Sequence, residues 1–490
     1  MSERSSVDPA GLCGTVAGRS WDPGRDERIE VLNPATGELV ASVPEAGADG
    51  AAEAVAAATA AFGGWRRTVP KERGVLMLEL AALIDERLEE LAELESLDVG
   101  KPLRSARKEL RSAAEKFRLY AGAGRAMGSV AAGEYLPGVT SFVRREPIGV
   151  VAALAPWNYP LGVGAWKIAP ALMAGNTVIL KPSPETPLST MLFGRLAAEH
   201  LPPGVLNVIT GGAPTGEALA LHPGVGMVSL TGGTATGRRV MELASRTLKR
   251  VHLELGGKAP AVVFDDADLG RLIEALRVAA FDNGGQNCAA ASRLYVSSGR
   301  REEVAAAIAA AAAAIEPQDP YENPDALLGS LISRAHRDRV HGFVERAAEA
   351  GAEILAGGEI GPGPGAFYPP TVVSGCEQGD EIVQREVFGP VLSVVSYEDE
   401  REAVEMANGV EYGLTASVWS SNVDRAMRVA REIQAGTVWI NDHGLSVHEM
   451  PYGGFKQSGI GRDLSLHAIE EHTELQHISI TVEEADDGER

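Results

Sequence analysis

Short apolar segments, many of them β-branched, alternate with segments of helical length through most of this chain. The first series of strand-like segments comprises residues 150–154, 177–180, 206–209 and 227–230. Segments of helical length, such as 188–200 and 216–222, lie between them. Buried strands that are separated by helices predict a parallel sheet covered on both faces. The alternation therefore indicates an α/β fold.

A second series of the same kind follows. Its strand-like segments are residues 260–264, 294–296, 391–397, 415–419 and 437–441. A chain of 490 residues is too long for one hydrophobic core, so we expect a second sheet in a second domain. The alanine-rich stretches 51–61 and 304–315 consist of strong helix formers and predict packed helices.

Two segments alternate apolar and polar residues, as half-exposed strands do. They are residues 139–145 and 473–482. We expect them to form a small antiparallel sheet, whose open edge would invite another subunit. The last residues, 483–490, form an acidic tail that we expect to be disordered.

The charge balance and the lack of long apolar runs exclude several classes of partner. The chain has 67 acidic and 45 basic residues, a net charge of −22, which argues against nucleic acid and anionic membranes. No run reaches the roughly 18 apolar residues of a membrane-spanning helix. Residues 1–28 lack the apolar core of a secretory signal, which predicts a cytoplasmic protein. Solubility explains the acidity, although attraction of a cationic substrate stays open.

Cys288 is the first candidate for chemistry. The chain has 3 cysteines, at positions 13, 288 and 376, so a disulfide framework is not expected. Cys288 follows two glycines and two side-chain amides at 284–287, a polar bend that can present the thiol to a pocket. A lone cysteine in this setting is either a nucleophile or a small buried apolar residue, and its loop alone leaves both open.

Three further motifs each suggest a functional site, but none of them is specific by itself. Asn158 stands between prolines after a strand, where its amide can donate to an oxyanion or simply form a turn. The glycine-rich segment 231–237 follows a strand and suits a pyrophosphate at a helix N-terminus, although its spacing is not the dinucleotide fingerprint. Glu254 has apolar neighbours that raise its proton affinity, as a general base requires, but it could equally be a solvated acid at a strand end.

These motifs occur together and in a fixed order. They are residues 156–160, 181–182, 231–237, 254–258, 285–288, 386–390 and 451–459. From about Ile29 to about Ile478 the chain resembles the NAD(P)-dependent aldehyde dehydrogenase superfamily. The resemblance implies two Rossmann-like αβ domains plus an oligomerisation hairpin. The parts would be a nucleotide-binding domain of 1–128 and 148–257, a catalytic domain of 258–466, and a hairpin of 129–147 and 467–482. It also implies a homo-oligomer, a tetramer or a dimer.

The resemblance assigns the catalytic roles. Cys288 would attack the aldehyde carbon to give a thiohemiacetal, and loss of hydride to the nicotinamide would leave a thioester. The Asn158 amide and the backbone N–H of Cys288 would hold the oxyanion. Glu254 would activate the water that hydrolyses the thioester, and could help to deprotonate the thiol.

The same resemblance implies a dinucleotide site. Lys181 and Glu386 match residues that bind the two riboses, while Trp157 and Gly232 match the walls of the adenosine and pyrophosphate sites. The full expected set is Trp157, Lys181, Ser183, Pro184, Gly232, Gly233, Gly237, Leu255, Gly256, Glu386 and Phe388. NAD is the expected cofactor. NADP stays possible, because Pro184 stands where many NAD-preferring members carry an acid, and the acid here, Glu185, falls one place later.

The substrate prediction also follows from resemblance. Segments 132–136, 255–260, 264–268, 448–454 and 463–466 are similar to the aminoaldehyde branch, which indicates an aminoaldehyde such as 4-aminobutanal. Tyr159, Trp166 and Tyr452 could line an aromatic tunnel for an ammonium group, or belong to the core. Asn287 stands where some members carry an aspartate that meets the amine, so it offers a dipole without a charge.

Several alternatives stay open. Betaine aldehyde, succinate semialdehyde or a broad range of aliphatic aldehydes would require the same mechanism. An acylating enzyme would pass the thioester to coenzyme A or phosphate, which Glu254 argues against, and a silent binding protein would have lost turnover.

Other polar residues suggest no further site. No metal is expected, and a monovalent cation is left open, because the scattered histidines show no ligand spacing: His222, His252, His336, His341 and His467. Asp265 and Asp266 predict a strand end and a helix cap, and the acidic run 398–400 predicts a helix start.

Overall fold

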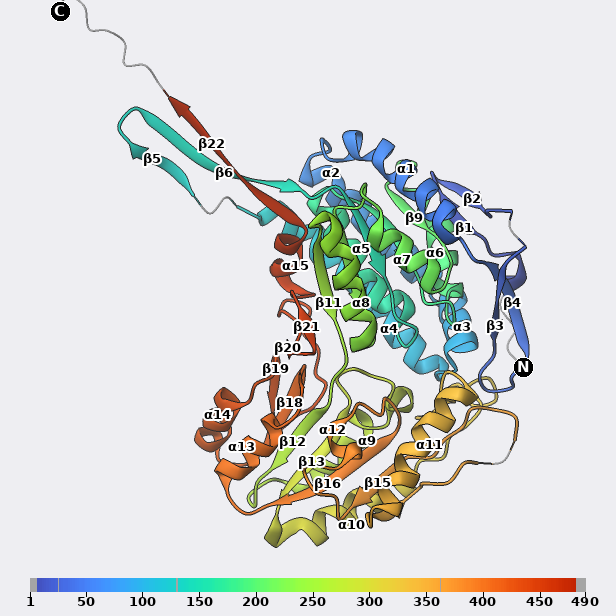
Figure 1. The fold of residues 1–490 in the computed structure, drawn as a ribbon, viewed down its shortest axis with the longest axis vertical. Coiled ribbons are helices and arrows are strands. Elements are labelled where there is room, and N and C mark those ends of the chain that lie inside the picture. Colours follow the sequence, from blue (N-terminus) through green and yellow to red (C-terminus); the bar gives the residue numbers. More distant parts are fainter. Residues whose placement is uncertain (1–6, 25, 129–130, 362, 482–490) are drawn as a thin grey trace, which may run out of the picture.

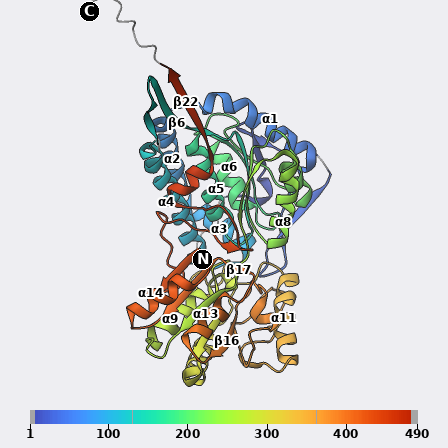
Figure 2. The same ribbon diagram turned by 60° about the vertical axis from the view of Figure 1, so that its left-hand side comes forward.

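The structure is a computed structural model that describes residues 7–24, 26–128, 131–361 and 363–481. The expected acidic tail lies outside the described residues. Two sheet-containing halves lie one above the other, and a narrow three-stranded sheet projects from the upper half (Figures 1 and 2). The mixed α/β fold with two sheets and an antiparallel hairpin confirms the expected fold class.

The first sheet has the strand order β2-β1-β9-β8-β7-β10-β11-β21. Its strands are β1 (Gly14–Val16), β2 (Arg19–Trp21), β7 (Val150–Leu154), β8 (Thr177–Lys181), β9 (Leu206–Val208), β10 (Met227–Thr231), β11 (Arg250–Glu254) and β21 (Gly459–Ile460). The strands from β9 to β11 are parallel, whereas β1 and β21 add antiparallel edges. All four strands of the first predicted series are present, because each is apolar enough to be buried on both faces.

Helices cover both faces of this sheet. They are α1 (Gly47–Trp65), α2 (Pro70–Glu86), α3 (Leu88–Val99), α4 (Leu103–Ala126), α5 (Pro160–Ala174), α6 (Leu188–Ala197), α7 (Ala213–Leu221) and α8 (Thr234–Ala244). A short hairpin, β3 (Arg28–Leu32) and β4 (Leu39–Pro44), lies beside them. Helix α5 starts at Pro160, whose fixed φ suits the first helical position, and ends at Gly175 with φ of 97°.

The second sheet has the strand order β14-β15-β16-β13-β12-β18-β19. Its strands are β12 (Ala259–Val263), β13 (Ala291–Ser297), β14 (Glu353–Ala356), β15 (Thr371–Ser374), β16 (Val391–Tyr397), β18 (Thr415–Trp419) and β19 (Thr437–Ile440). One apolar cluster packs α9 (Leu269–Ala279) and α10 (Arg301–Ala313) on one face. Another packs α11 (Arg334–Glu349), α13 (Glu400–Asn408) and α14 (Val423–Glu432) on the other face, near the short α12 (Glu381–Gln384).

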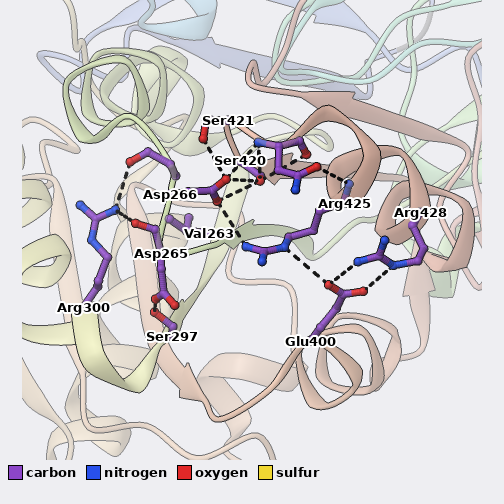
Figure 3. A network of polar contacts seen from close by, with 12 residues as sticks. Val263, Asp265, Asp266, Ser297, Arg300, Glu400, Ser420, Ser421, Arg425 and Arg428 are labelled. Carbon is purple, nitrogen blue, oxygen red and sulfur yellow. Dashed lines mark hydrogen bonds and ion pairs between the residues drawn. The ribbon is translucent and has the colours of Figure 1, made fainter.

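The two adjacent aspartates after β12 do not cap the helix that follows them. The cap of α9 is Asp268, which accepts a hydrogen bond from the backbone N–H of Arg271. Asp266 instead accepts hydrogen bonds from the Ser420 hydroxyl and from the backbone N–H of Asn422, which fastens the loop before α14 (Figure 3). The prediction of a helix cap at 265–266 was therefore wrong. The predicted helix start at 398–400 is confirmed, because α13 begins at Glu400.

The projecting sheet consists of β5 (Ala132–Leu136), β6 (Val139–Pro147) and β22 (Thr473–Thr481), all antiparallel. Helix α15 (Ser465–Glu471) leads into β22. Four large apolar side chains of this sheet are exposed: Tyr135, Leu136, Leu475 and Ile480. Among the described residues, no helix combines the length and apolar character that crossing a membrane requires.

The two sheets meet end to end. The chain leaves the carboxyl end of β11 at Glu254 and enters the amino end of β12 at Ala259. The segment after the short pair β17 (Tyr412–Gly413) and β20 (Phe455–Lys456) then returns to this junction. Gly459 of β21 lies opposite Glu254, and the Ser458 hydroxyl donates to the Gly256 carbonyl at 2.7 Å. Ligand sites of parallel sheets lie at carboxyl strand ends, so this junction is where a site is expected.

Candidate active site

A cavity of about 1160 Å³ lies at the junction of the two sheets. Its walls come from the carboxyl ends of the first sheet, the loop that carries Cys288, helix α4 and the segment 443–452. It brings together Asn158, Glu254 and Cys288, the three predicted catalytic residues. Asn158 precedes Cys288 by 130 residues and Glu254 precedes it by 34, so only the fold brings the three together.

The loop before Cys288 is held in an unusual backbone conformation. Asn283, Gly284 and Gly285 have φ values of 52°, 69° and 64°, all in the left-handed region. A Cβ on Gly285 would collide with the carbonyl of Gly389, so glycine is required there. The buried Gln286 side chain accepts a hydrogen bond from the backbone N–H of Ile332 at 2.9 Å. The loop is therefore fixed on both sides of the bend.

The Cys288 thiol points into the cavity among polar groups. Its Sγ lies 3.4 Å from the Tyr452 hydroxyl and 3.8 Å from Oδ1 of the Asn287 side chain. Burial raises the pKa of the Cys288 thiol well above its usual range, and the negative charge of Glu254 raises it further. The sulfur is thus protonated near neutral pH, and its attack on a carbonyl requires a base that takes the proton.

Glu254 has the properties of such a base. It ends strand β11, its residue is 2% exposed, and its Oε1 has no hydrogen-bond partner among the described residues. Burial raises the pKa of its carboxyl to about 7, while a hydrogen bond from Cys288 opposes the shift. Near neutral pH the group therefore exchanges protons readily, as a general base must.

Asn158 is positioned by contacts on two sides. Its Nδ2 donates to the Gln286 carbonyl at 2.8 Å, which uses one of two amide protons and leaves the other for an oxyanion. Its own carbonyl accepts from the Lys101 ammonium at 2.7 Å and from the Asn283 amide at 3.1 Å. Lys101 also forms a buried ion pair with Glu109. The sequence analysis missed Lys101, because nothing local marks a lysine that acts 57 residues away.

The other end of the cavity carries most of the predicted cofactor residues. The Trp157 and Phe388 rings meet edge to face with centroids 5.3 Å apart. Lys181 donates to the carbonyls of Pro182 and Gly211 at 2.8 and 2.7 Å, and burial lowers its pKa to about 8. Glu386 accepts from the Gly257 N–H at 2.8 Å, and burial raises its pKa to about 7.

These residues fit a dinucleotide. Gly232 and Gly233 line the cavity at the N-terminus of the 11-residue helix α8, where backbone N–H groups favour a phosphate. A Cβ on Gly233 would meet no atom within 4 Å, so there is open space beside the backbone. The Lys181 ammonium lines the cavity and keeps one proton free beyond its two bonds to carbonyls. An anionic group would accept it.

The remaining cofactor predictions divide into two groups. Ser183, Pro184, Leu255 and Gly256 line the cavity with the residues above. Gly237 does not line it and instead packs α8 against Leu255, the residue after β11, whose side chain would lie 2.6 Å from a Cβ at position 237. The Ser183 hydroxyl donates to the Glu185 carboxylate and holds that acid beside the loop.

The predicted substrate residues lie at the opposite end from α8. Trp166 and Tyr452 meet at a centroid distance of 5.0 Å and an angle of 70°, and both line the cavity with Tyr159 and Asn287. The Lys101 ammonium lies 4.3 Å from the Tyr159 ring centroid, so that ring already has a cation on one face. Helix α4 adds Ser112 and Lys116, which the sequence analysis did not name. The described residues contain no cluster of three or more His, Cys, Asp or Glu side chains that could hold a metal.

Known proteins resemble this chain over nearly its whole length. Residues 21–478 match the model of the aldehyde dehydrogenase family. A betaine aldehyde dehydrogenase of Bacillus subtilis is 42% identical over 467 residues, 94% of this chain and 95% of that protein. A 4-trimethylaminobutyraldehyde dehydrogenase B of Danio rerio is 38% identical over 466 residues, 93% and 89% of the two chains.

The architecture agrees with the sequence matches. The NAD+ complex of an aldehyde dehydrogenase from Bacillus cereus superposes with a TM-score of 0.94 at 36% identity, covering 96% of this chain and 97% of that one. With the cysteine, the amide and the buried carboxyl gathered at one cavity, the chain belongs to the aldehyde dehydrogenase family.

Proposed function

We propose that this protein oxidises an aldehyde to the carboxylic acid, with NAD as hydride acceptor, through a thioester on Cys288. The observation that carries the proposal is the meeting of Cys288, Asn158 and a buried Glu254 at one end of a cavity whose other end fits a dinucleotide. The similarity to an NAD+ complex supports NAD, and NADP use stays possible at the Pro184 position.

The geometry supports a division of labour among the three residues. Sγ of Cys288 attacks the carbonyl carbon while its proton passes to the Glu254 carboxylate, whose pKa of about 7 suits the transfer. The second amide proton of Asn158 and the Cys288 backbone N–H donate to the oxygen as its charge develops. The dinucleotide, when bound, supplies the acceptor for the hydride that the thiohemiacetal must lose. Glu254 must release the thiol proton to solvent before deacylation. Its carboxylate then takes a proton from the water that hydrolyses the thioester, and the Cys288 sulfur is the leaving group.

We infer that the substrate is an aminoaldehyde, such as 4-aminobutanal, with betaine aldehyde as the alternative. Two relatives named for quaternary ammonium aldehydes support this class. The rings of Trp166 and Tyr452 offer π faces at the end of the cavity beyond the sulfur, where a cationic tail is favoured by about 0.5–2 kcal/mol. Asn287 contributes an amide dipole beside Cys288.

A panel of aldehydes that differ in terminal charge tests both the oxidation of aldehydes and the preference for cationic ones. We expect NADH to form with 4-aminobutanal and betaine aldehyde at higher kcat/KM than with butanal or succinate semialdehyde. Free acid should form without coenzyme A. Absence of NADH with every aldehyde would indicate a silent protein of the same fold. A strict requirement for coenzyme A or phosphate would indicate an acylating enzyme instead.

A further inference from the structure

Helix α4 places a lysine against the ring that we expect to receive the substrate tail. Lys116 is 3% exposed and lines the cavity. Its Nζ lies 5.6 Å from the centroid of the Trp166 ring and donates to the Ser112 hydroxyl at 2.8 Å. The protein's own cation therefore occupies a π face that a substrate ammonium would otherwise use.

The groups around Lys116 leave its charge without a direct counterion. The two acids that favour its charged form are Glu109, which is paired with Lys101, and Asp463, which lies 3.5 Å from Lys167. Among the described residues, Lys116 forms no ion pair.

The remaining neighbours do not neutralise it either. The segment 443–452 contributes His448, whose Nε2 lies 3.0 Å from the Ser112 hydroxyl, followed by Glu449 and Tyr452. Loss of water and the charge of Lys116 both lower the pKa of His448, so this ring stays neutral near pH 7. On α4 itself Glu115 is adjacent in sequence, and Lys108 is exposed at the cavity wall. Burial therefore dominates, and the pKa of Lys116 falls to about 7.

We propose that Lys116 sets which charge the substrate tail can carry. When protonated, Lys116 repels a cationic tail and attracts a carboxylate tail at the same place. When neutral, it no longer binds the Trp166 π face, which becomes available to an ammonium group. The inference rests on the proposed function and deepens it, because it makes the preference for cationic aldehydes a property of the enzyme above neutral pH.

A matched pair of aldehydes isolates this effect from catalysis. Betaine aldehyde and 3,3-dimethylbutanal have nearly the same shape, and only the first carries a charge, which does not titrate. The quotient of their kcat/KM values cancels the titration of Glu254 and Cys288, which act on both alike. Between about pH 6 and about pH 9 we expect this quotient to rise about tenfold or more, with a midpoint near the Lys116 pKa. The corresponding quotient for succinate semialdehyde against butanal should fall over the same range.

Variants at position 116 separate charge from shape. Lys116→Met keeps an unbranched side chain without charge, so the betaine aldehyde quotient should be flat within about twofold and match the high-pH wild-type value. Lys116→Arg keeps the charge at all accessible pH values, so the quotient should stay low throughout. Arg111→Met removes an exposed cation of the same helix that does not line the cavity, and should preserve the pH dependence.

The outcomes distinguish this proposal from the proposed function. A flat quotient in the wild type, with 3,3-dimethylbutanal still oxidised, overturns the role of Lys116 alone. A pH dependence retained in Lys116→Met also overturns it. If neither aldehyde yields NADH at any pH, both proposals fail together. The wild-type profile is decisive even where a variant does not fold.

Discussion

Glu254 and Cys288 are both withdrawn from water, and burial shifts the pKa of each toward its neutral form. A carboxyl with a pKa of about 7 beside a protonated thiol makes one proton available for exchange between them. The Cys288 thiol thus loses its proton only when it attacks an aldehyde, and it is not a thiolate beforehand. A protonated thiol is oxidised less readily than a thiolate, so we expect the sulfur to be less sensitive to oxidants when no aldehyde is present.

Replacement of the nucleophile separates chemistry from binding. Cys288→Ala should abolish NADH formation with every aldehyde, because no other thiol lines the cavity. NAD binding should persist, since the phosphate loop and Lys181 are untouched. Calorimetric titration with NAD measures the second property. Residual turnover above a few per cent of wild type would contradict the role of Cys288.

Replacement of the base should separate the two halves of the reaction. Glu254→Gln removes the proton acceptor for the hydrolytic water and keeps the shape, so steady-state turnover should fall about 100-fold or more. A burst of NADH should still precede the slow turnover, with a smaller rate constant than in wild type because the sulfur also loses its proton acceptor. Stopped-flow absorbance detects the burst. An unchanged steady-state rate without a burst would count against this residue as the base.

The same variant has a pH signature in stability. The folded pKa of Glu254, about 7, lies above the ordinary value of 4.5, so the native state holds this proton while the unfolded chain loses it. Wild-type stability therefore decreases as pH rises through this window, by about 3 kcal/mol for this group. Glu254→Gln lacks this loss. Its melting temperature should exceed that of wild type at about pH 8, and the difference should shrink towards about pH 5.

At the scale of elements, the two loops at the sheet junction determine what reacts and what binds. The loop before Cys288 contains three successive left-handed residues, of which Gly285 faces the Gly389 carbonyl. The loop after β8 presents Ser183 and Pro184 to the cofactor end of the cavity.

An added methyl group tests the first loop. Gly285→Ala combines a left-handed φ with a collision against backbone, a cost of about 1–3 kcal/mol or more. We expect kcat/KM to fall at least about tenfold because the sulfur is displaced. Gly299→Ala is the matched control, since a Cβ there meets no atom within 4 Å. Equal kcat/KM in the two variants would show that the bend does not position Cys288.

An added charge tests the second loop. Pro184→Glu should place a carboxylate near a cofactor 2′-phosphate and raise the Kd of NADP about tenfold while NAD binding changes little. Fluorescence titration of each nucleotide measures both constants without turnover. Glu185→Gln reports the contribution of the acid already present, which Ser183 holds. An unaltered ratio of the two Kd values in Pro184→Glu would refute this account of the loop.

Local sequence patterns predicted strands and helices well where a strand is buried on both faces, because such a strand must be apolar along its whole length. They failed where a residue acts through distant partners. Asp266 was taken for a cap, yet it bonds a loop more than 150 residues further along the chain. Lys101 and Lys116 have no sequence signature, because their partners at 158 and 166 come from other elements. Gly237 matched a cofactor motif, but the Leu255 side chain occupies the space beside its Cα.

At the scale of the whole molecule, the projecting sheet carries large apolar side chains that the single chain leaves exposed. Strand β22 presents Leu475 and Ile480, which are 59% and 50% exposed, on a sheet that extends away from both halves (Figure 1). We expect this sheet to join copies of the chain into a dimer or tetramer, since exposed apolar strands favour association.

Charges on that strand should prevent assembly. The double variant Leu475→Glu and Ile480→Glu should elute as a smaller species than wild type in size-exclusion chromatography with light scattering. Val423→Glu, at an equally exposed apolar position on α14, should keep the wild-type mass. A wild-type protein that is already monomeric, or a double variant of unchanged mass, would contradict this assignment.

The late return of the chain to the sheet junction has a consequence for biosynthesis. The base-bearing strand β11 gains its outer neighbour only when Gly459 arrives, more than 200 residues after Glu254 itself. A nascent polypeptide still attached to the ribosome therefore carries the sulfur, the amide and the acid long before they form a working centre. Reactive aldehydes in the cell would meet a competent thiol only after translation is nearly finished.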